Sequence, residues 1–404
     1  MALIVQKYGG TSVGSTERIR EVAGRIVRTA ERGDGVVVVV SAMGETTDEL
    51  LAMAQGITPL PNAREMDLLL TAGERIAMSL LAIAINAKGQ KAASYTGSQA
   101  GIITDTEHGR AKIVDVRPGR IQQALDEGNV VIVAGFQGVS TAYDVTTLGR
   151  GGSDTTAVAL AAALGADACE IYTDVEGVFT ADPRIEPAAR KLTAISYEEM
   201  LEMAASGAKV LQLRSVEYAR RYNVPLMVRS SFNDESGTWV KEESMEQALI
   251  SGVAHDESEV KVTIVNVPDR PGVAARIFRD IADDGVNVDM IVQNVSHEGS
   301  TDMSFTTPKA DLPKLEQVMQ RVLKDVGAPD YEIDDGIAKL SLVGAGMKSH
   351  PGVAADMFEA LASEGINIAM ISTSSIRISC VIRAADTEKA VRAIHSKFDL
   401  GNNG

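Results

Sequence analysis

Short apolar runs rich in Val and Ile alternate, in the first half of the chain, with longer segments whose apolar residues recur at helical spacing. The runs cover residues 3–5, 36–40, 130–133 and 170–172, and the helical segments cover 15–30, 65–87 and 154–164. Fully apolar strands between amphipathic helices are typical of a parallel sheet covered on both faces. We therefore predict an αβα sandwich with a mostly parallel sheet and right-handed crossovers.

The pattern changes after Phe232, where residues 233–246 read NDESGTWVKEESME. Charged and polar residues around a glycine are typical of a surface connection between domains. We expect a first domain over residues 1–232 and a linker over 233–246.

An internal duplication follows this connection. Residues 260–294 match residues 338–374, and the matching residues are always separated by the same interval. The pairs are Pro271 with Pro351, Gly272 with Gly352, Val273 with Val353, Phe278 with Phe358, Gly285 with Gly365, Asn287 with Asn367, and Met290 with Met370. Each copy predicts a strand, a Pro-Gly turn, a helix, a Gly-Asn turn and a strand.

The segments 301–306 and 312–323 extend the first copy to a βαββαβ unit. We expect one such α+β unit over residues 260–334. A second unit is expected to combine residues 247–259 with 335–404.

Composition narrows the class of protein. A chain of 404 residues exceeds one ordinary core, and 45% hydrophobic with only 4% aromatic residues suits aliphatic strands. The net charge of -16 disfavours nucleic-acid and membrane partners. Cys169 and Cys380 lie far apart in apolar surroundings, as expected of buried thiols in a reducing compartment. The first residues resemble no leader, and no run approaches the ~18 apolar residues of a membrane span, so we expect a cytoplasmic protein.

Two glycine-rich loops are candidates for binding an anion. Lys7, Tyr8, Gly9 and Gly10 follow the first strand, and three glycines around Arg150 precede a helix that begins near Asp154. Backbone N–H groups at such loops and helix starts attract phosphate, and an arginine can hold a carboxylate through two parallel hydrogen bonds. Either loop alone is compatible with an ordinary turn, but the two together favour a phosphate-handling site.

A third segment, residues 173–184, follows the strand that ends near Tyr172 and is rich in acidic residues. Its carboxylates could accept hydrogen bonds from a ribose or hold magnesium, and Arg184 could meet a phosphate. By itself this segment is also compatible with a solvated charged loop.

Six motifs together resemble the aspartate kinase branch of the amino-acid kinase family. They are KYGGTSV at 7–13, SAMGETTDEL at 41–50, LLTAGER at 69–75, GFQG at 135–138, TTLGRGGSDTTA at 146–157 and YTDVEGVFTADPR at 172–184. The duplicated half resembles the paired ACT domains of these enzymes. The resemblance implies the amino-acid kinase fold followed by two ACT-like units.

The resemblance also implies an activity. It is the phosphorylation of the side-chain carboxylate of L-aspartate by ATP with Mg²⁺, the first step toward Lys, Thr and Met. The resemblance assigns catalytic roles to Lys7 and Asp154, and it assigns no residue to the metal. Substrate contacts fall on Ser41, Thr47, Glu74, Arg150 and Asp154. Nucleotide contacts fall on Lys7, Tyr8, Gly9, Gly10, Thr173, Asp174, Phe179, Asp182, Arg184 and Lys209.

Feedback regulation by Thr, Lys or both is a further implication. The effector would bind Asp269, Gly272, Ala274 and Gln293 of one subunit together with Asn367 and Ile368 of another. The protein would then be a homo-oligomer, or would assemble with a shorter regulatory chain that starts near Met245. The second ACT-like copy could instead only pair subunits. Many relatives have glutamate where this chain has Ser375, which sets aside any role of that glutamate here.

Two other functions are compatible with the residues. The kinase-like half could bind a nucleotide without catalysis, although the presence of Lys7, Glu74, Arg150 and Asp154 together argues against a silent sensor. The acceptor could also be another acidic metabolite such as glutamate.

Overall fold

The computed structural model describes residues 2–242, 249–294, 299–348 and 350–402, which form two compact units. The first unit holds the residues up to Val178 together with 191–204 and 209–242. The second holds 179–190, 205–208 and the described residues from 249 onward. The internal start expected near Met245 lies outside the described residues.

The first unit is built on an eight-stranded sheet with the order β10-β12-β11-β9-β1-β2-β6-β3. Its strands are β1 (Leu3–Tyr8), β2 (Gly35–Val40), β3 (Ala92–Tyr95), β6 (Val130–Ala134), β9 (Ala168–Thr173), β10 (Ala194–Ser196), β11 (Leu226–Ser230) and β12 (Thr238–Lys241). Six neighbouring strands from β3 to β11 run parallel, while β12 pairs antiparallel with β11. The predicted, mostly parallel sheet is confirmed.

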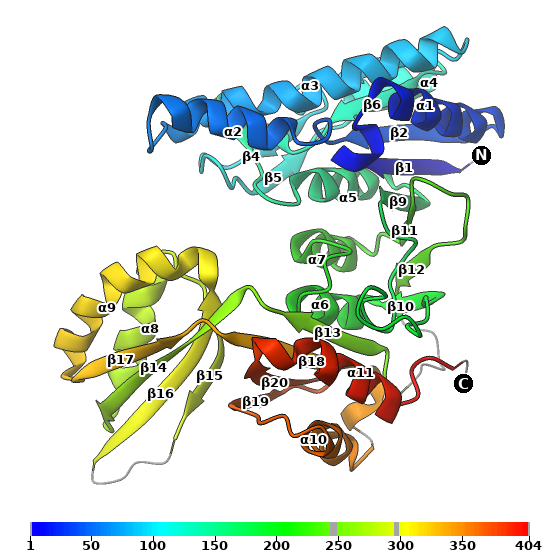
Figure 1. Ribbon diagram of the computed structural model, residues 1–404. Helices are drawn as coiled ribbons and strands as arrows, with labels where there is room; N and C mark the ends of the chain where they lie inside the picture. The colour runs from blue at the N-terminus through cyan, green and yellow to red at the C-terminus, as the bar shows by residue number, and fades with distance from the viewer. Residues whose placement is uncertain (1, 243–248, 295–298, 349, 403–404) are drawn as a thin grey trace. The chain divides into compact units, whose positions relative to one another are not determined.

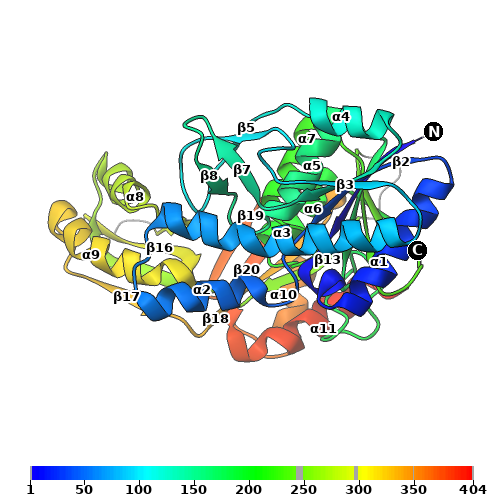
Figure 2. The ribbon, with the colours of Figure 1, turned by 90° about the horizontal axis from the view of Figure 1, so that it is seen from above.

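Helices cover both faces of this sheet. Figure 1 shows α1 (Thr16–Glu31) and α3 (Ala63–Ala87) on one face and α5 (Gly152–Leu164) on the other. In α1 the buried residues Ile19, Val22 and Ile26 recur every three or four positions, so they form one apolar stripe against the sheet. The view from above in Figure 2 shows α3 extended beside α1 and α2 (Thr46–Ile57). The predicted helices at 15–30, 65–87 and 154–164 are therefore confirmed, with ends shifted by one or two residues.

A smaller sheet and the remaining helices complete the first unit. The sheet has the order β5-β4-β7-β8. Its strands are β4 (Ile102–Thr104), β5 (Ile113–Val116), β7 (Gln137–Ser140) and β8 (Val145–Thr147), and the other helices are η1 (Gly10–Val13), α4 (Gly119–Asp126), α6 (Tyr197–Ala205) and α7 (Leu213–Tyr222). Strand β8 leads directly into the second glycine-rich loop.

The polar segment after Phe232 differs from the simple connection that its composition suggested. Thr238–Lys241 form β12 inside the main sheet, with Val240 fully buried. Thr238 is also buried, and its hydroxyl donates to the carbonyl of Leu192 at 2.6 Å. This strand was missed because its four residues are flanked on both sides by charged ones.

The described residues of the second unit form two sheets, each accompanied by two α-helices. The first has the order β15-β16-β14-β17 and the second the order β13-β18-β20-β19. The first comprises β14 (Glu259–Pro268), α8 (Val273–Asp283), β15 (Asp289–Gln293), β16 (Ser300–Pro308), η2 (Lys309–Asp311), α9 (Leu312–Val326) and β17 (Asp330–Asp334). The second comprises β13 (Gly252–Asp256), β18 (Ile337–Val343), η3 (Ala345–Lys348), α10 (Val353–Ser363), β19 (Met370–Thr373), β20 (Arg377–Arg383), η4 (Ala384–Asp386) and α11 (Thr387–Lys397). The two predicted α+β units are thus present.

Helix α3 has a composition that the sequence analysis did not single out. Among the described helices it alone is long and apolar enough to cross a membrane, with a mean hydropathy of 1.8 in its most apolar window, of which 44% is buried. It also carries the buried side chains of Asp67, Thr71 and Glu74. Because its buried face packs on α1 and β6, the composition of α3 is explained by a place in the core.

Candidate active site

The candidate site lies at the carboxyl ends of the parallel strands, where the strand order reverses. From β1 the chain continues to β2 on one side, whereas β9 pairs with the other side of β1. In open α/β sheets, ligands bind in the crevice beyond such a switch point. The loops that follow β1, β2 and β9 all open there.

An ion pair stands at this edge. Lys7, near the end of β1, places Nζ 2.6 Å from Oδ1 of Asp154, and the side chains are only 12% and 9% exposed. Asp154 lies in the first turn of α5, where the helix dipole favours a negative charge. Beneath them, burial and the nearby Asp154 raise the pKa of the Cys169 thiol, which stays neutral. The positions of β1 and α5 therefore orient Lys7 and Asp154 toward each other.

The loops after β1 and β2 pack closely because glycine stands at their contact. A Cβ atom on Gly10 would lie 2.9 Å from the carbonyl oxygen of Ala42. The N–H of Ser41 donates to the carbonyl of Tyr8 at 3.1 Å, which ties the two loops together. Ser41 thus borders the loop that holds Gly10, and Thr47 lies in the first turn of α2.

Glu74 places a buried carboxylate at the same edge. Its Oε1 accepts from the N–H of Ala42 at 3.2 Å, and its buried Oε2 has no partner among the described residues. Burial raises the pKa of Glu74 to about 7, although hydrogen bonds from its own backbone and from Ala42 lower it. A buried oxygen without a donor is a position where an ammonium group would gain a strong partner.

The second glycine-rich loop depends on left-handed backbone on either side of Arg150. Gly149 and Gly151 have φ angles of 75° and 71°, a conformation that other residues seldom adopt. The half-buried guanidinium of Arg214 donates to the carbonyl of Leu148 at 2.9 Å and holds the base of the loop. Arg150 itself is exposed at the tip.

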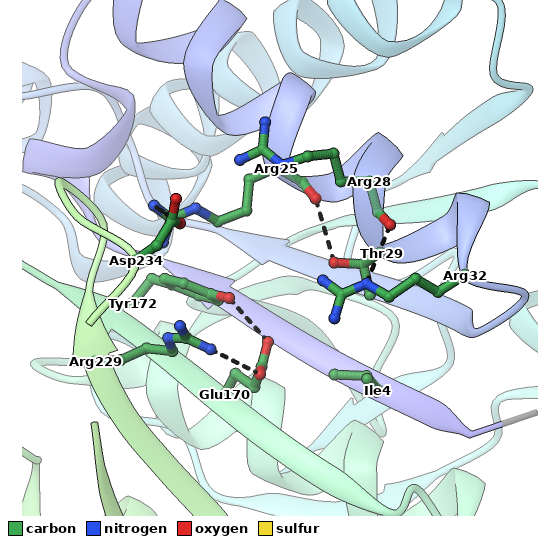
Figure 3. Close-up of a pocket in the computed structure, with 9 residues that line it drawn as sticks. All are labelled: Ile4, Arg25, Arg28, Thr29, Arg32, Glu170, Tyr172, Arg229 and Asp234. Atoms are coloured by element: carbon green, nitrogen blue, oxygen red, sulfur yellow. Dashed lines mark hydrogen bonds and ion pairs between the residues drawn. The ribbon is translucent and has the colours of Figure 1, made fainter. Parts of the chain in front are cut away.

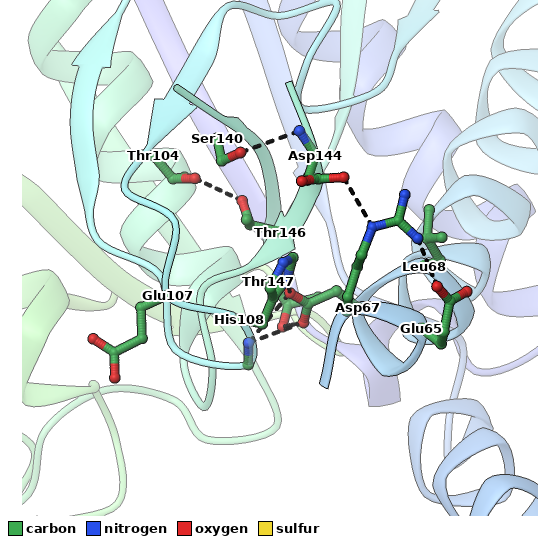
Figure 4. A network of polar contacts seen from close by, with 12 residues as sticks. Glu65, Asp67, Leu68, Thr104, Glu107, His108, Ser140, Asp144, Thr146 and Thr147 are labelled. Atoms are coloured by element: carbon green, nitrogen blue, oxygen red, sulfur yellow. Dashed lines mark hydrogen bonds and ion pairs between the residues drawn. The ribbon is translucent and has the colours of Figure 1, made fainter. Parts of the chain in front are cut away.

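A polar network that the sequence analysis missed supports this loop (Figure 4). The fully buried Asp67 of α3 accepts from His108 Nδ1 at 2.6 Å, from the N–H of Gly109 at 3.0 Å and from Thr147 Oγ1 at 2.5 Å. Thr147 ends β8, immediately before the loop. The sequence contains one signal for this network. Asp67 precedes Glu74 by seven positions, so both acidic side chains lie on one face of the helix.

The predicted nucleotide contacts divide between the two units. Thr173 and Asp174 follow β9 and are hydrogen-bonded to each other at 3.0 Å, while Lys209 is exposed in the first unit. Tyr8 turns a fully buried side chain away from the loop, so any contact it makes there comes from its backbone.

Phe179, Asp182 and Arg184 belong instead to the segment 179–190 of the second unit. Arg184 and Asp182 pair at 2.6 Å, and this hydrogen bond holds the pKa of Asp182 below its usual value. Their charges are therefore engaged with each other.

The residues fit a magnesium ion that arrives with a nucleotide. The described residues contain no group of three or more His, Cys, Asp or Glu side chains that could enclose a metal. Mg²⁺ in phosphoryl-transfer sites is usually held by one or two carboxylates, waters and the phosphates themselves. Asp154 is the acidic side chain closest to Lys7 in this arrangement.

The predicted effector residues lie at one end of the first sheet of the second unit. Asp269 follows β14, Gly272 caps α8 with a φ of 91°, and Ala274 lies in the first turn of that helix. Gln293 ends β15, which runs parallel to β14 because both pair antiparallel with β16. Both strands therefore present exposed residues at the same edge.

Asn367 and Ile368 stand just before β19 in the second sheet, the former exposed and the latter half-buried. Ser375 lies in the turn between β19 and β20 and is exposed.

Comparison with known proteins shows which families and relatives this chain is similar to. Residues 2–230 match the amino acid kinase family, and residues 261–327 and 340–398 each match an ACT domain. The chain is 60% identical to an aspartokinase from Mycolicibacterium smegmatis, over all of this chain and 97% of that one. It is 57% identical to an aspartokinase from Corynebacterium efficiens, with the same coverage.

Solved structures agree with these matches. The fold is similar to that of Escherichia coli aspartokinase III in complex with aspartate and ADP, with a TM-score of 0.83, 26% identity and coverage of 98% of this chain and 99% of that one. The complex of the same enzyme with lysine and aspartate gives a TM-score of 0.77 at the same identity and coverage.

Proposed function

Because the chain belongs to the amino acid kinase family, as an aspartate kinase with two ACT domains, we propose that it transfers the γ-phosphoryl group of ATP to the side-chain carboxylate of L-aspartate. The product is 4-phospho-L-aspartate, and this step opens the synthesis of Lys, Thr and Met. The observation that supports the proposal best is the Lys7–Asp154 ion pair at the sheet edge that also holds the unpartnered Glu74 oxygen.

The chemistry needs positioning rather than a general base. A β-carboxylate oxygen attacks the γ-phosphorus, the bond to the bridging oxygen breaks, and ADP leaves with that electron pair. The carboxylate is already ionised at neutral pH, so no proton has to be removed. Lys7 offsets the negative charge on the transferring group, and Asp154 holds the lysine in place.

The substrate is held by its α-amino acid groups. Glu74, with its free buried oxygen, receives the ammonium, and Asp154 borders the same group. Arg150 grips the α-carboxylate, and its exposed position at the tip of a glycine loop allows it to close over the substrate. Ser41 and Thr47 line the space toward the phosphate. The β-carboxylate is then free to face the nucleotide.

The nucleotide lies along the loops after β1 and β9. The backbone of Tyr8, Gly9 and Gly10 binds the phosphates of the nucleotide. Thr173 and Asp174 lie on the side of the ribose. Phe179, Asp182, Arg184 and Lys209 complete this contact set. Magnesium bound to the phosphates would neutralise part of their charge.

One assay tests the activity directly. The full chain with ATP, Mg²⁺ and L-aspartate should yield a product that hydroxylamine traps as a hydroxamate, and L-glutamate in place of aspartate should yield far less. Absence of hydroxamate at millimolar substrates from folded protein would refute the proposal, and equal yields would reassign the acceptor.

We further propose feedback inhibition by lysine, threonine or both. The effector carboxylate accepts hydrogen bonds from the N–H groups at the start of α8 near Gly272. Asp269 and Gln293 at the same edge bind its other polar groups. Asn367 and Ile368 of another subunit close the site, which makes the protein a homo-oligomer or a partner of a shorter regulatory chain.

A titration of Lys and Thr, singly and together, tests this regulation. Inhibition should be weaker in Gln293→Ala, and the turnover without effector should match that of the unaltered chain. A coupling of about 1–3 kcal/mol corresponds to several-fold to hundred-fold inhibition. Insensitivity of the unaltered chain to every combination would refute the regulation, whereas equal inhibition of both proteins would remove only this site.

We make further proposals about the bounds of the domains, the location of the protein and its partners. We propose that the catalytic domain extends over 1–232, with the ACT-like units over 260–334 and over 247–259 with 335–404. We propose that the protein works in the cytoplasm, without nucleic-acid or membrane partners, in keeping with its charge of -16.

A further inference from the structure

A cationic pocket lies on the opposite face of the main sheet from the candidate active site. In β1, Lys7 points toward Asp154 and α5, so its neighbours Gln6 and Tyr8 point to the other face, toward α1. The register pairs Gln6 with Glu170 and Tyr8 with Tyr172, which places all four side chains on that face. Figure 3 shows the residues that line the pocket between α1 and these strands. Because Lys7 points to the other face of the sheet, the pocket is separate from the active site.

The floor of the pocket is rigid, and its acidic group is already engaged. Tyr172 stacks on Tyr8 with ring centroids 4.6 Å apart. Oε2 of Glu170 accepts from Gln6 Nε2 at 2.8 Å and from the Tyr172 hydroxyl at 3.0 Å. Burial, followed by the charge of Glu170, raises the pKa of Tyr172 to about 12, so this hydroxyl remains a donor at neutral pH. Glu170 is thus held by the floor through Oε2, while its Oε1 pairs with Arg229 at 3.6 Å.

Two arginines of the wall are fixed in place. Arg25 of α1 donates to the carbonyls of Ser230 and Asn233 at 3.0 and 2.8 Å and lies 5.1 Å from the centre of the Tyr172 ring. Arg229 of β11 lies 5.5 Å from the same ring, and its buried Nε has no acceptor within the described part of the chain. An N–H without an acceptor is a position that an incoming oxygen can fill.

Two further arginines line the mouth without a counter-charge. Arg28 of α1 and Arg32, the C-cap residue of that helix, are exposed, and across the residues that the structure describes neither forms an ion pair. The Nε of Arg32 donates only to the carbonyl of Arg28, at 3.3 Å. Figure 3 shows both on the rim beside Thr29. Their remaining N–H groups are available to a ligand.

The charge and size of the pocket select a small dianion. Four guanidinium groups are offset by the carboxylates of Glu170 and Asp234, which leaves two positive charges in a protein whose net charge is -16. The cavity measures about 100 Å³, below the ~300 Å³ at which pockets for drug-sized organic ligands begin. Arginine groups match the oxygens of phosphate with paired hydrogen bonds.

We propose that this pocket binds the phosphate dianion, either as free phosphate or as the phosphate group of a small monoester. The proposal is independent of the proposed catalytic function, because the two sites share no side chain. Tyr172, supported from below by Tyr8, forms the floor, Arg25 and Arg229 supply fixed positive charge, and the arginines of the rim close over the ligand.

The test titrates inorganic phosphate into the full chain at constant ionic strength, by calorimetry, with ADP, Mg²⁺ and aspartate present to occupy the active site. We expect binding of phosphate with a Kd in the millimolar range or tighter. The double variant Arg28→Gln, Arg32→Gln should weaken it at least tenfold. The matched variant Arg20→Gln, Arg117→Gln removes the same charge from exposed positions elsewhere and should leave the affinity unchanged.

A third variant tests whether removing a negative charge from the pocket strengthens phosphate binding. Asp234 is 79% exposed and pairs with Arg25 at 3.1 Å, so Asp234→Asn removes a negative charge from the pocket and should tighten phosphate binding several-fold. A parallel titration with glycerol 3-phosphate distinguishes free phosphate from a monoester as the preferred ligand. Equal weakening in both double variants, no tightening in Asp234→Asn, or no phosphate binding up to ~10 mM would each overturn the proposal.

Discussion

At the scale of single residues, Lys7 and Asp154 behave as one unit, since each neutralises the other in a largely buried setting. We expect Lys7→Ala to lower kcat roughly 100-fold while the KM for ATP changes little, because the charge matters most as the phosphoryl group moves. Steady-state kinetics with ATP and aspartate varied in turn measure both constants.

The pairing itself is tested by a double-mutant cycle. Asp154→Ala misplaces Lys7, so Lys7→Ala combined with Asp154→Ala should cost little more than the worse single substitution. Fully multiplicative losses would mean that the two side chains act independently.

Glu74 makes substrate binding depend on pH. Burial raises its pKa to about 7, so the ionised fraction falls as the pH drops below that value. The substrate ammonium needs the ionised form, and we therefore expect kcat/KM for aspartate to fall about tenfold per pH unit on the acid side of an inflection near 7. The pH profile of Glu74→Gln, although lower throughout, should lack this inflection. An identical inflection in that variant would assign it to another group.

At the scale of elements, regular local patterns were the predictable part of the structure. The valine run of β2 and the spaced apolar residues of α1 specify strand and helix by themselves. The ion pair of Lys7 and Asp154 joins two elements 147 positions apart, so the motif resemblance, and not the local pattern, brought these residues together.

Two features could not be predicted locally. Strand β12 is stabilised by pairing with β11 on one side and with the more distant β10 on the other, and nothing in its own four residues indicates these partners. Asp67 looks like an ordinary polar position in a helix, and only the fold shows that it is fully buried and accepts three hydrogen bonds.

The support that α3 gives to β8 can be tested with Asp67→Asn. The amide keeps the shape of the carboxylate but turns one acceptor into a donor facing three donors, which costs about 1–3 kcal/mol per group left unsatisfied. Because Thr147 precedes the Arg150 loop, we expect the KM for aspartate to rise about tenfold while the KM for ATP stays unchanged. Asp126→Asn on the exposed face of α4 is the control. Equal rises in both KM values would indicate general loosening of the fold.

At the scale of the whole molecule, one buried lysine joins the two ACT sheets. Lys339 of β18 is 1% exposed and bonds to Glu259 of β14, to Asp289 of β15 at 2.9 Å and to the carbonyl of Ala205 at 3.3 Å. Burial alone would lower the pKa of Lys339, but Glu259 and Asp289 raise it above its ordinary value, so the amine stays charged.

We expect Lys339→Met to lower the free energy of unfolding of the second unit by about 3 kcal/mol, because Glu259 is left buried without a counter-charge. Urea unfolding followed by hydrogen exchange in β14 and β18 measures the loss. Adding Glu259→Met should restore much of it, and Lys389→Met at an exposed pair should change little. A loss of similar size in the Lys389 control would contradict the role of the buried charge.

The place of β13 also determines the order in which the chain can fold as it is synthesised. Gly252 pairs with Val343, and the whole first ACT domain lies between them. At about 5–20 residues per second, a ribosome needs roughly 5 to 20 s to supply the missing partner strand. The first ACT domain can fold during this interval, while β13 waits with an unpaired edge that invites wrong pairing. The second ACT domain is therefore the last part of the protein to form, and a chain that stops after residue 334 leaves β13 without its partner.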